Sequence, residues 1–454
     1  MQAMSVLDLA ACVGGEVVGD GTARFDSVGI DTRRIGAGAL FVALRGSRVD
    51  GHDFLGQAAA AGAAGALVER AASSPLPQVR VTDAREALWA LAARVRAAAA
   101  AGVVGLTGSN GKTTVKEMLA SILGRLAPTL WTEGNLNNEL GVPLTLCRLN
   151  PEHRYAVIEM GANHPGEIAR LAALARPHVG LVNNAGAAHL EGFGSLQGVA
   201  EAKGELYTAL AEDGVAVVNV DDRFAGYWLG LAAPRRCLSF SLQGPGDVWA
   251  EDAAPDNRFL LRVADDSHWV RLPLPGRHNV MNALAAAAAA TALGIGVADI
   301  AAGLETVQPV AGRLSWRVGR AGLRVLDDTY NANPGSLAAA VEVLSAVPGP
   351  RWVVLGDMAE LGGGSEVMHR EAGRQLRQAG VDRLFACGPH AAASVEAFGS
   401  GGQAFAGRDE LIAALEGAVC GEEAILVKGS RSMAMERVVA ALQAGQGSAV
   451  GRMH

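Results

Sequence analysis

The chain has 454 residues, of which 50% are hydrophobic and 19% are charged, with a formal net charge of −7. This composition excludes a disordered chain. It also argues against a nucleic-acid-binding protein, which normally carries a basic surface. At roughly 150 residues per domain, the length is enough for about three domains.

Lysine is rare in this chain. Only four of the 39 basic residues are lysines (Lys112, Lys116, Lys203 and Lys428), and the other 35 are arginines. An ammonium group is more compact than a guanidinium, and it loses its proton more readily when it is buried. The four lysine positions are therefore the first candidates for special chemistry.

The remaining composition predicts a soluble, cytoplasmic protein. The five cysteines are scattered without a CxxC pair, unlike those of a zinc site or a disulfide framework. The first 15 residues lack the basic start and the long apolar run of a secretory signal. The most apolar stretch, residues 283–304, is mostly alanine and contains Asp299, so we expect a tightly packed helix and a connector there rather than a membrane span.

Strand-like and helical segments alternate along the chain, which predicts an α/β protein of three domains. We expect a first domain over residues 1–100, a central phosphate-loop domain over 101–311 and a Rossmann-like domain over 312–454. The expected strands are residues 25–30, 40–44, 103–107, 155–160, 179–184, 215–220, 323–326, 351–355, 383–387 and 424–427. The helical patterns between the last four strands indicate a mostly parallel sheet. Residues 242–275 alternate between apolar and polar, which indicates a small antiparallel excursion.

Residues 103–123 predict a strand, a glycine-rich loop and a helix. Backbone amides at the start of such a helix suit a polyphosphate, the Lys112 ammonium would reach its terminal phosphates, and the Thr113 hydroxyl would hold Mg²⁺. Leu106 stands where the general phosphate-loop pattern has Gly or Ala, so a plain glycine turn capped by threonine is the alternative. Lys116 lies one helical turn further on, and we expect it to be solvated. The loop residues expected at the nucleotide are Gly108, Asn110, Gly111, Lys112, Thr113 and Thr114.

Three further residues suggest a metal site. Glu159 ends an apolar strand, where a carboxylate commonly holds phosphate-bound Mg²⁺. His189 follows the next strand, although a lone histidine is more often structural. Lys203 falls on the apolar stripe of a helical pattern, and an inward lysine must find a partner, lose its proton or be modified, for example to a carbamate. Alternatively, Lys203 reaches solvent along its stem or pairs with Glu201 or Glu205.

Nine segments, in chain order, resemble those of the Mur ligases, the ATP-dependent amide-forming enzymes of peptidoglycan synthesis. They are TGSNGKTT, TEGNLNNELGVP, EMGANHPGEI, NNAGAAHLEGFGS, EAKGEL, PGRHNVMNALAAA, LDDTYNANP, GDMAELG and KGSRSMAMERV. The glycine loop fits the family's TGxNGKT form. The GNLNNELGVP, DDTYNANP and GDMAELG segments are most similar to the branch that adds D-alanyl-D-alanine to a UDP-muramyl tripeptide. The DNPR-type motif of the sister branch, which adds the third residue, is not found.

The resemblance implies a role for residues in all three domains. Lys112, His189 and Lys203 would be catalytic, with ATP, two Mg²⁺ ions and a carbamate on Lys203. Thr32 stands where the family more often has serine. The implied metal ligands are Thr113, Glu159, His189 and Lys203; the implied nucleotide contacts beyond the loop are His278, Asn279, Asn282, Arg313 and Asp328; the implied substrate contacts are Thr32, Arg33, Asn135, Asn137, Asn138, Tyr330, Asn331, Asn333, Lys428, Ser430 and Arg431.

The resemblance also implies the reaction. A peptide carboxylate would be activated as an acyl phosphate and then attacked by the amine of D-Ala-D-Ala, while the third domain closes and excludes water. The partners would be these small molecules, without nucleic acid, and the protein would be a monomer. Two rivals stay open: a folylpolyglutamate synthase, which would not need the first 100 residues, and a non-ligase phosphate-loop ATPase, which would have no use for His189 and Lys203.

Overall fold

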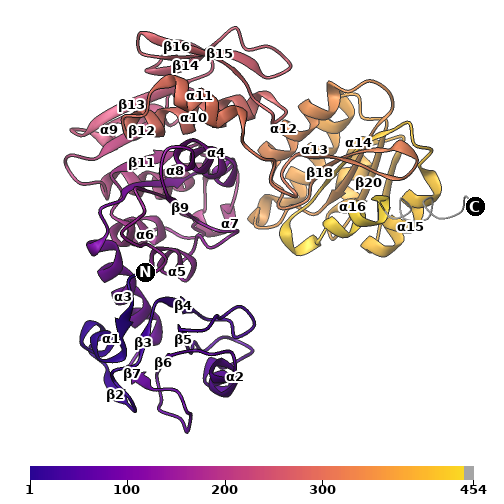
Figure 1. Cartoon of the computed structure of the whole chain (residues 1–454). Coiled ribbons are helices and arrows are strands. Elements are labelled where there is room, and N and C mark those ends of the chain that lie inside the picture. Colours follow the sequence, from indigo (N-terminus) through magenta and orange to yellow (C-terminus); the bar gives the residue numbers. More distant parts are fainter. Residues whose placement is uncertain (444–454) are drawn as a thin grey trace, which may run out of the picture.

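The computed structural model describes residues 1–443 and contains three larger sheets that follow one another along the chain (Figure 1). In the first unit the sheet has the order β2-β7-β6-β5-β4, and a two-stranded β1-β3 ribbon lies beside it. Its elements are β1 (Met4–Ser5), α1 (Val6–Val13), β2 (Glu16–Val18), β3 (Arg24–Phe25), β4 (Ser27–Gly29), β5 (Ala39–Val42), α2 (Leu55–Ala60), β6 (Gly65–Val68), β7 (Gln78–Arg80) and α3 (Ala84–Ala98).

The central unit is built on a nine-stranded sheet with the order β16-β15-β14-β13-β12-β11-β8-β10-β9. In the order of the sheet, all strands from β14 to β9 pair in parallel. Strands β14, β15 and β16 pair antiparallel and form the predicted antiparallel excursion. The strands are β8 (Gly102–Thr107), β9 (Thr129–Trp131), β10 (Tyr155–Glu159), β11 (Val179–Val182), β12 (Val215–Asn219), β13 (Arg236–Ser241), β14 (Val248–Glu251), β15 (Arg258–Val263) and β16 (Asp266–Arg271). The helices are α4 (Lys112–Gly124), α5 (Gly141–Leu146), α6 (Glu167–Ala175), α7 (Leu190–Phe193), α8 (Leu196–Thr208), α9 (Ala225–Ala232), α10 (Arg277–Ala292) and α11 (Val297–Glu305).

The last unit has a six-stranded sheet with the order β17-β18-β22-β19-β20-β21, parallel except for the edge strand β17. Its elements are β17 (Ser315–Val318), β18 (Arg324–Asp328), α12 (Pro334–Ser345), β19 (Arg351–Gly356), α13 (Ser365–Gln378), β20 (Arg383–Cys387), α14 (Ala391–Phe398), β21 (Gly402–Phe405), α15 (Arg408–Ala418), β22 (Ala424–Lys428) and α16 (Glu436–Gln443). All ten predicted strand segments therefore contain strands. The end of the predicted domain 312–454 lies outside the described residues.

In both parallel sheets the strand order reverses at one point, which leaves a crevice at the carboxyl ends of the strands. In the central sheet this point is β8, which lies between β10 and β11. In the C-terminal sheet β22 inserts between β18 and β19. Most of the predicted site residues lie at the carboxyl ends of these strands and of their neighbours, or in the loops that follow. The two sheets therefore present these residues at the carboxyl ends of their strands.

The alanine-rich segment forms two helices, α10 and α11, joined by a connector. All eight residues from 283 to 290 are completely buried, in a cluster with apolar side chains of α4 and of the central sheet. Small side chains allow the helix to lie close to its neighbours, so the run of alanines reflects tight packing. Within residues 1–443 no helix is long and apolar enough to cross a membrane.

Lys116, Lys203 and Lys428 are each only 1% exposed. The prediction that Lys116 is solvated was wrong, because α4 packs against β9 and β10 of the sheet as well as against α10 and α11, and Lys116 is buried in this packing. Its Nζ is 2.9 Å from Oε1 of the neighbouring Glu117. The five cysteines are free.

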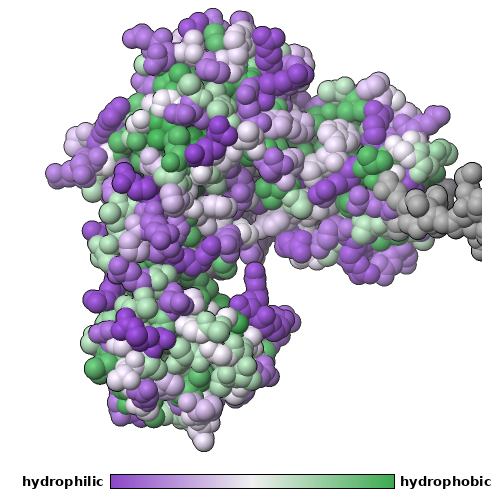
Figure 2. Space-filling model, in the orientation of Figure 1, coloured by the Kyte–Doolittle hydropathy of each residue, from purple (hydrophilic) through white to green (hydrophobic). Residues whose placement is uncertain are grey.

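Helix α3 holds the first unit on the central unit. Buried Arg96 donates from Nε to the Ala175 carbonyl at 2.7 Å and from Nη2 to the Arg176 carbonyl at 2.8 Å. The Arg170 guanidinium lies 4.4 Å from the ring centroid of Trp89. Figure 2 shows a hollow between the first unit, at the bottom of the view, and the C-terminal unit.

Because Ala286 and its neighbours from 283 to 290 are completely buried, replacement of Ala286 by leucine should overpack the core. We expect Ala286→Leu to lower the free energy of unfolding by about 1–3 kcal/mol in urea titrations. The control is Ala97→Leu on the exposed face of α3, which should change it by less than about 0.5 kcal/mol. Equal stabilities of the two variants would contradict the tight packing of α10.

Candidate functional site

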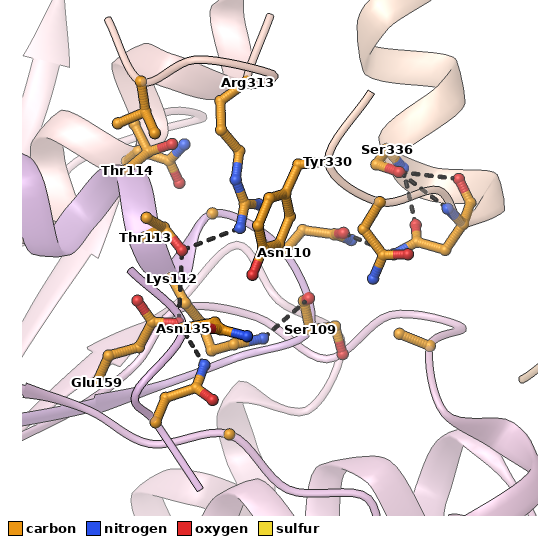
Figure 3. Close-up of a pocket in the computed structure, with 18 of the residues that line it drawn as sticks. Ser109, Asn110, Lys112, Thr113, Thr114, Asn135, Glu159, Arg313, Tyr330 and Ser336 are labelled. Atoms are coloured by element: carbon orange, nitrogen blue, oxygen red, sulfur yellow. Dashed lines mark hydrogen bonds between the residues drawn. The ribbon is translucent and has the colours of Figure 1, made fainter. Parts of the chain in front are cut away.

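A cleft of about 720 Å³ lies where the phosphate loop of the central unit meets the loops after β18 and β22. Polar side chains line much of it, and they come from both units (Figure 3). The predicted site residues that line it are Asn110, Gly111, Lys112, Thr113, Thr114, Asn135, Asn137, Asn138, Glu159, His189, His278, Asn279, Asn282, Arg313, Asp328, Tyr330, Asn331, Asn333 and Lys428.

The phosphate loop starts α4 at Gly111, which has the left-handed φ of 79°. A Cβ at this position would lie 2.6 Å from Nδ2 of Asn183 and would also collide with Asn282, so both the conformation and the space require glycine. Lys112 folds back over the loop and donates from Nζ to the Gly108 carbonyl at 2.7 Å. Burial lowers the pKa of Lys112 from its ordinary value. The loop thus has the local geometry of a polyphosphate site.

The Thr113 hydroxyl lies between the two units. It accepts a hydrogen bond from Nη2 of Arg313 at 3.0 Å and donates to Oε1 of Glu159 at 3.4 Å (Figure 3). Asn137 donates to the same carboxylate oxygen at 2.8 Å. The other oxygen, Oε2, is buried and has no hydrogen-bond partner in the described part of the chain. A buried carboxylate oxygen without a donor, beside a hydroxyl and a phosphate loop, fits a Mg²⁺ ligand set.

Lys203 points inward, as predicted, and its alternatives are not observed. Its Nζ lies 5.2 Å from the ring centroid of Phe193, and among residues 1–443 no carboxylate lies within 4.0 Å of it. The carboxylate of Glu205 instead accepts from the backbone amides of Gly166 at 2.7 Å and Ala169 at 3.0 Å. Burial, and next the positive charge of Lys112, lower the pKa of Lys203 to about 7. The amine is thus close to its uncharged form, the form that reacts with CO₂.

His189 precedes α7 and lines the cleft. Burial and then the charge of Lys112 lower the pKa of His189. Its Nδ1 lies 2.5 Å from Oε2 of Glu360, a residue of the C-terminal unit. His189 therefore takes part in the contact between the two units.

Two asparagines at the start of α10 and one directly after β11 form a chain of hydrogen bonds. Asn183 donates to Oδ1 of Asn282 at 2.9 Å, and Asn282 donates to Oδ1 of Asn279 at 3.0 Å. These amides position the phosphate loop against α10. Next to them, burial lowers the pKa of His278 to about 4, so its ring is neutral near pH 7.

One further residue of the C-terminal unit contacts the phosphate loop: Asn333 donates to Oδ1 of Asn110 at 2.7 Å. Within the C-terminal unit, the guanidinium of Arg313 lies 3.9 Å from the ring centroid of Tyr330. Buried Lys428 forms an ion pair with Asp328. Lysine and aspartate at the ends of two adjacent strands thus close the base of the cleft.

Several predicted residues lie away from the cleft lining. Thr32 and Arg33 belong to the first unit, where Arg33 is exposed and pairs with Asp31. Arg431 is exposed and pairs with Glu436. Gly108, Lys203 and Ser430 are buried and do not line the cleft. Asn138, which does line the cleft, accepts the backbone amide of Gly141 at 2.9 Å and so helps to cap α5.

Sequence reasoning missed Asn184 and Glu360. Asn184 accepts the backbone amide of Asn110 at 2.9 Å, so it holds the phosphate loop in place. Glu360 approaches His189 from the other unit. Both residues lie in segments quoted above for their resemblance, but their spacing from the phosphate loop carries no signal of contact, because only the sheets bring them there.

Models of three Mur ligase domains match this chain. Residues 24–96 match "Mur ligase family, catalytic domain", residues 106–290 match "Mur ligase middle domain" and residues 312–431 match "Mur ligase, glutamate ligase domain".

Whole relatives match as well. The chain is 47% identical over 449 residues, with 98% of this chain and 99% of the relative covered, to the UDP-N-acetylmuramoyl-tripeptide–D-alanyl-D-alanine ligase of Escherichia coli K12. A MurF crystal structure from Acinetobacter baumannii is 40% identical, with a TM-score of 0.91 and coverage of 98% and 99%. The MurF ligase of Thermotoga maritima in complex with ADP is 30% identical, with a TM-score of 0.79 and coverage of 92% and 97%. This three-domain α/β chain belongs to the Mur ligase family.

Proposed function

We propose that this chain joins D-alanyl-D-alanine to a UDP-N-acetylmuramoyl tripeptide at the expense of ATP, in the cytoplasmic synthesis of peptidoglycan precursors. The observation that carries the proposal is the Thr113 hydroxyl, held between Glu159 of the central unit and Arg313 of the C-terminal unit. This arrangement is what a nucleotide-closing ligase requires. The similarity to the Escherichia coli ligase that is named for this reaction extends along 98% of the chain and supports the choice of substrates.

ATP fits the phosphate loop, with its phosphates on the amides from Gly108 to Thr114 and near the Lys112 ammonium. His278, Asn279 and Asn282 line the same cleft and would contact the nucleoside, and Arg313 and Asp328 would contact the nucleotide from the other unit. The peptide carboxylate attacks the γ-phosphate to give an acyl phosphate and ADP. The amine of D-Ala-D-Ala then attacks the acyl carbon, and phosphate leaves. Closure of the cleft keeps water from the acyl phosphate.

Two Mg²⁺ ions are proposed at this site. The first would be held by Thr113 and Glu159, whose buried Oε2 lacks a donor among the described residues. The second would be held by His189 and by Lys203 as a carbamate. Bound Mg²⁺ would neutralise the phosphate oxygens and so lessen their repulsion of the peptide carboxylate.

The remaining assignments concern substrates and organisation. Thr32 and Arg33 face the uridine diphosphate, and Asn135, Asn137 and Asn138 lie along the path from the first unit to the phosphate loop. Tyr330, Asn331, Asn333, Lys428, Ser430 and Arg431 belong to the D-Ala-D-Ala side. Domain boundaries at 1–100, 101–311 and 312–454 are proposed, with a monomer as the working unit.

A substrate matrix tests the reaction. Phosphate release from ATP should require both a UDP-muramyl tripeptide and D-Ala-D-Ala, and it should be absent with the UDP-muramyl dipeptide or with free diaminopimelate as the amine. The ligated product is measured by mass spectrometry. Release that ignores both substrates would favour a simple ATPase, and activity on a folate substrate would favour a folylpolyglutamate synthase.

The carbamate on Lys203 has its own test. We expect Lys203→Ala to lower kcat by at least ~10²-fold, the usual cost of losing one such electrostatic group, with little change in the unfolding midpoint. Lys203→Arg keeps the charge but cannot form the carbamate, so it should be equally impaired. A short-chain carboxylic acid should partly rescue Lys203→Ala and not Lys203→Arg. In ¹³C-bicarbonate the native enzyme should show a carbamate carbon signal that the variants lack. Full activity of Lys203→Ala would refute the carbamate.

A further inference from the structure

Two residues with an unfavourable backbone conformation meet where the central and C-terminal units touch. His189 has a φ of 56° and Glu360 a φ of 62°, in the left-handed region that non-glycine residues seldom adopt. Such conformations persist where the surrounding structure fixes them, and they gather at functional sites. Nδ1 of His189 is buried and lies 2.5 Å from Oε2 of Glu360, a close contact whose angles are not those of a hydrogen bond.

The loop that carries Glu360 is fixed by the interior of its own unit. The backbone amide of Met358 donates to Nε2 of His369 at 3.0 Å, and that of Ala359 donates to Oγ of Ser430 at 2.7 Å. His369 is 1% exposed and Ser430 is 3% exposed. Glu360 therefore extends rigidly from the C-terminal unit, and its position follows that unit.

On the central side the loop rests on the start of α7. The backbone amide of Glu191 donates to the Glu360 carbonyl at 3.3 Å, so main chain as well as side chain crosses the boundary. His189 lines the nucleotide cleft, whereas Glu360 does not. The His189 ring is thus the side chain that connects Glu360 to the cleft.

We propose that Glu360 is a positioning residue that couples closure of the C-terminal unit to the orientation of His189. Its carboxylate engages Nδ1, fixes the ring and leaves Nε2 as the nitrogen available to a divalent cation. Metal-binding histidines commonly use their second nitrogen in this way, but here the carboxylate comes from another domain. The cation site at His189 is then complete only in the closed enzyme. This inference rests on the proposed function for its metal.

The first experiment measures Mn²⁺ binding by electron paramagnetic resonance in the full-length protein with a non-hydrolysable ATP analogue. Glu360→Ala should weaken the His189-side Mn²⁺ by about 10–100-fold, while Mn²⁺ at the phosphate loop is retained. In turnover, kcat should fall and KM for the UDP-muramyl tripeptide should stay within about twofold. Glu360→Gln keeps the shape and one acceptor oxygen, so it should lose less. The control is Glu366→Ala, an exposed glutamate of α13 that pairs with Arg370.

A double-mutant cycle distinguishes a positioning role of Glu360 from a contact that only holds the two units together. If Glu360 acts through the histidine, Glu360→Ala should not weaken Mn²⁺ binding further in a His189→Ala background. An equal loss in both backgrounds, or native Mn²⁺ affinity in Glu360→Ala, would overturn the inference. The inference would also be overturned if solution scattering showed that Glu360→Ala no longer closes while its Mn²⁺ affinity is unchanged. If the native protein showed no substrate-dependent ATP turnover, the proposed function would fail, but the Mn²⁺ comparison would still decide the role of Glu360.

Discussion

The hydroxyl of Thr113 is the contact on which the site depends. It is the first side chain after Lys112 on α4, it donates to Glu159 at the end of β10, and it accepts from Arg313 just before β17. One hydroxyl thus joins the phosphate loop, the proposed metal carboxylate and the C-terminal unit. Since each partner belongs to a different element, the cleft has this form only while the two sheets are held edge to edge.

Buried charge is concentrated around this contact. Lys112, Lys203 and Lys428 lie in or directly behind the cleft, and burial lowers the pKa of the first two. Bringing several amines together away from water is unfavourable without anions to offset them. A polyphosphate and a carbamate would supply such anions. The same electrostatic argument explains the lowered pKa of Lys203. Among the described residues, its amine has no carboxylate within 4.0 Å to stabilise the charged form.

The rigid and the movable parts of the molecule differ in how they are joined. Arg96 hydrogen-bonds carbonyls of the central unit through the buried side of α3, which fixes the first unit at that joint. The C-terminal unit is joined to the central unit by polar contacts such as Asn333 with Asn110 and His189 with Glu360. Polar contacts around a cleft can be broken and remade in water at little cost, which suits a unit that opens and closes over substrates.

The sequence by itself determined ten strand segments, the strand–loop–helix form of the phosphate loop and the inward direction of Lys203, because hydrophobic periodicity and glycine spacing act over a few residues. Strands such as β6, β7, β9 and β13 were not predicted. It also singled out lysine as a rare residue, and three of the four lysines are fully buried. Only the tertiary structure decided that Lys116 is covered, since α4 packs against strands and helices from other parts of the chain. It likewise decided that Asn184 supports the loop and that Glu360 meets His189. Contacts between separate elements depend on strand order and on the docking of whole units, which no local pattern specifies.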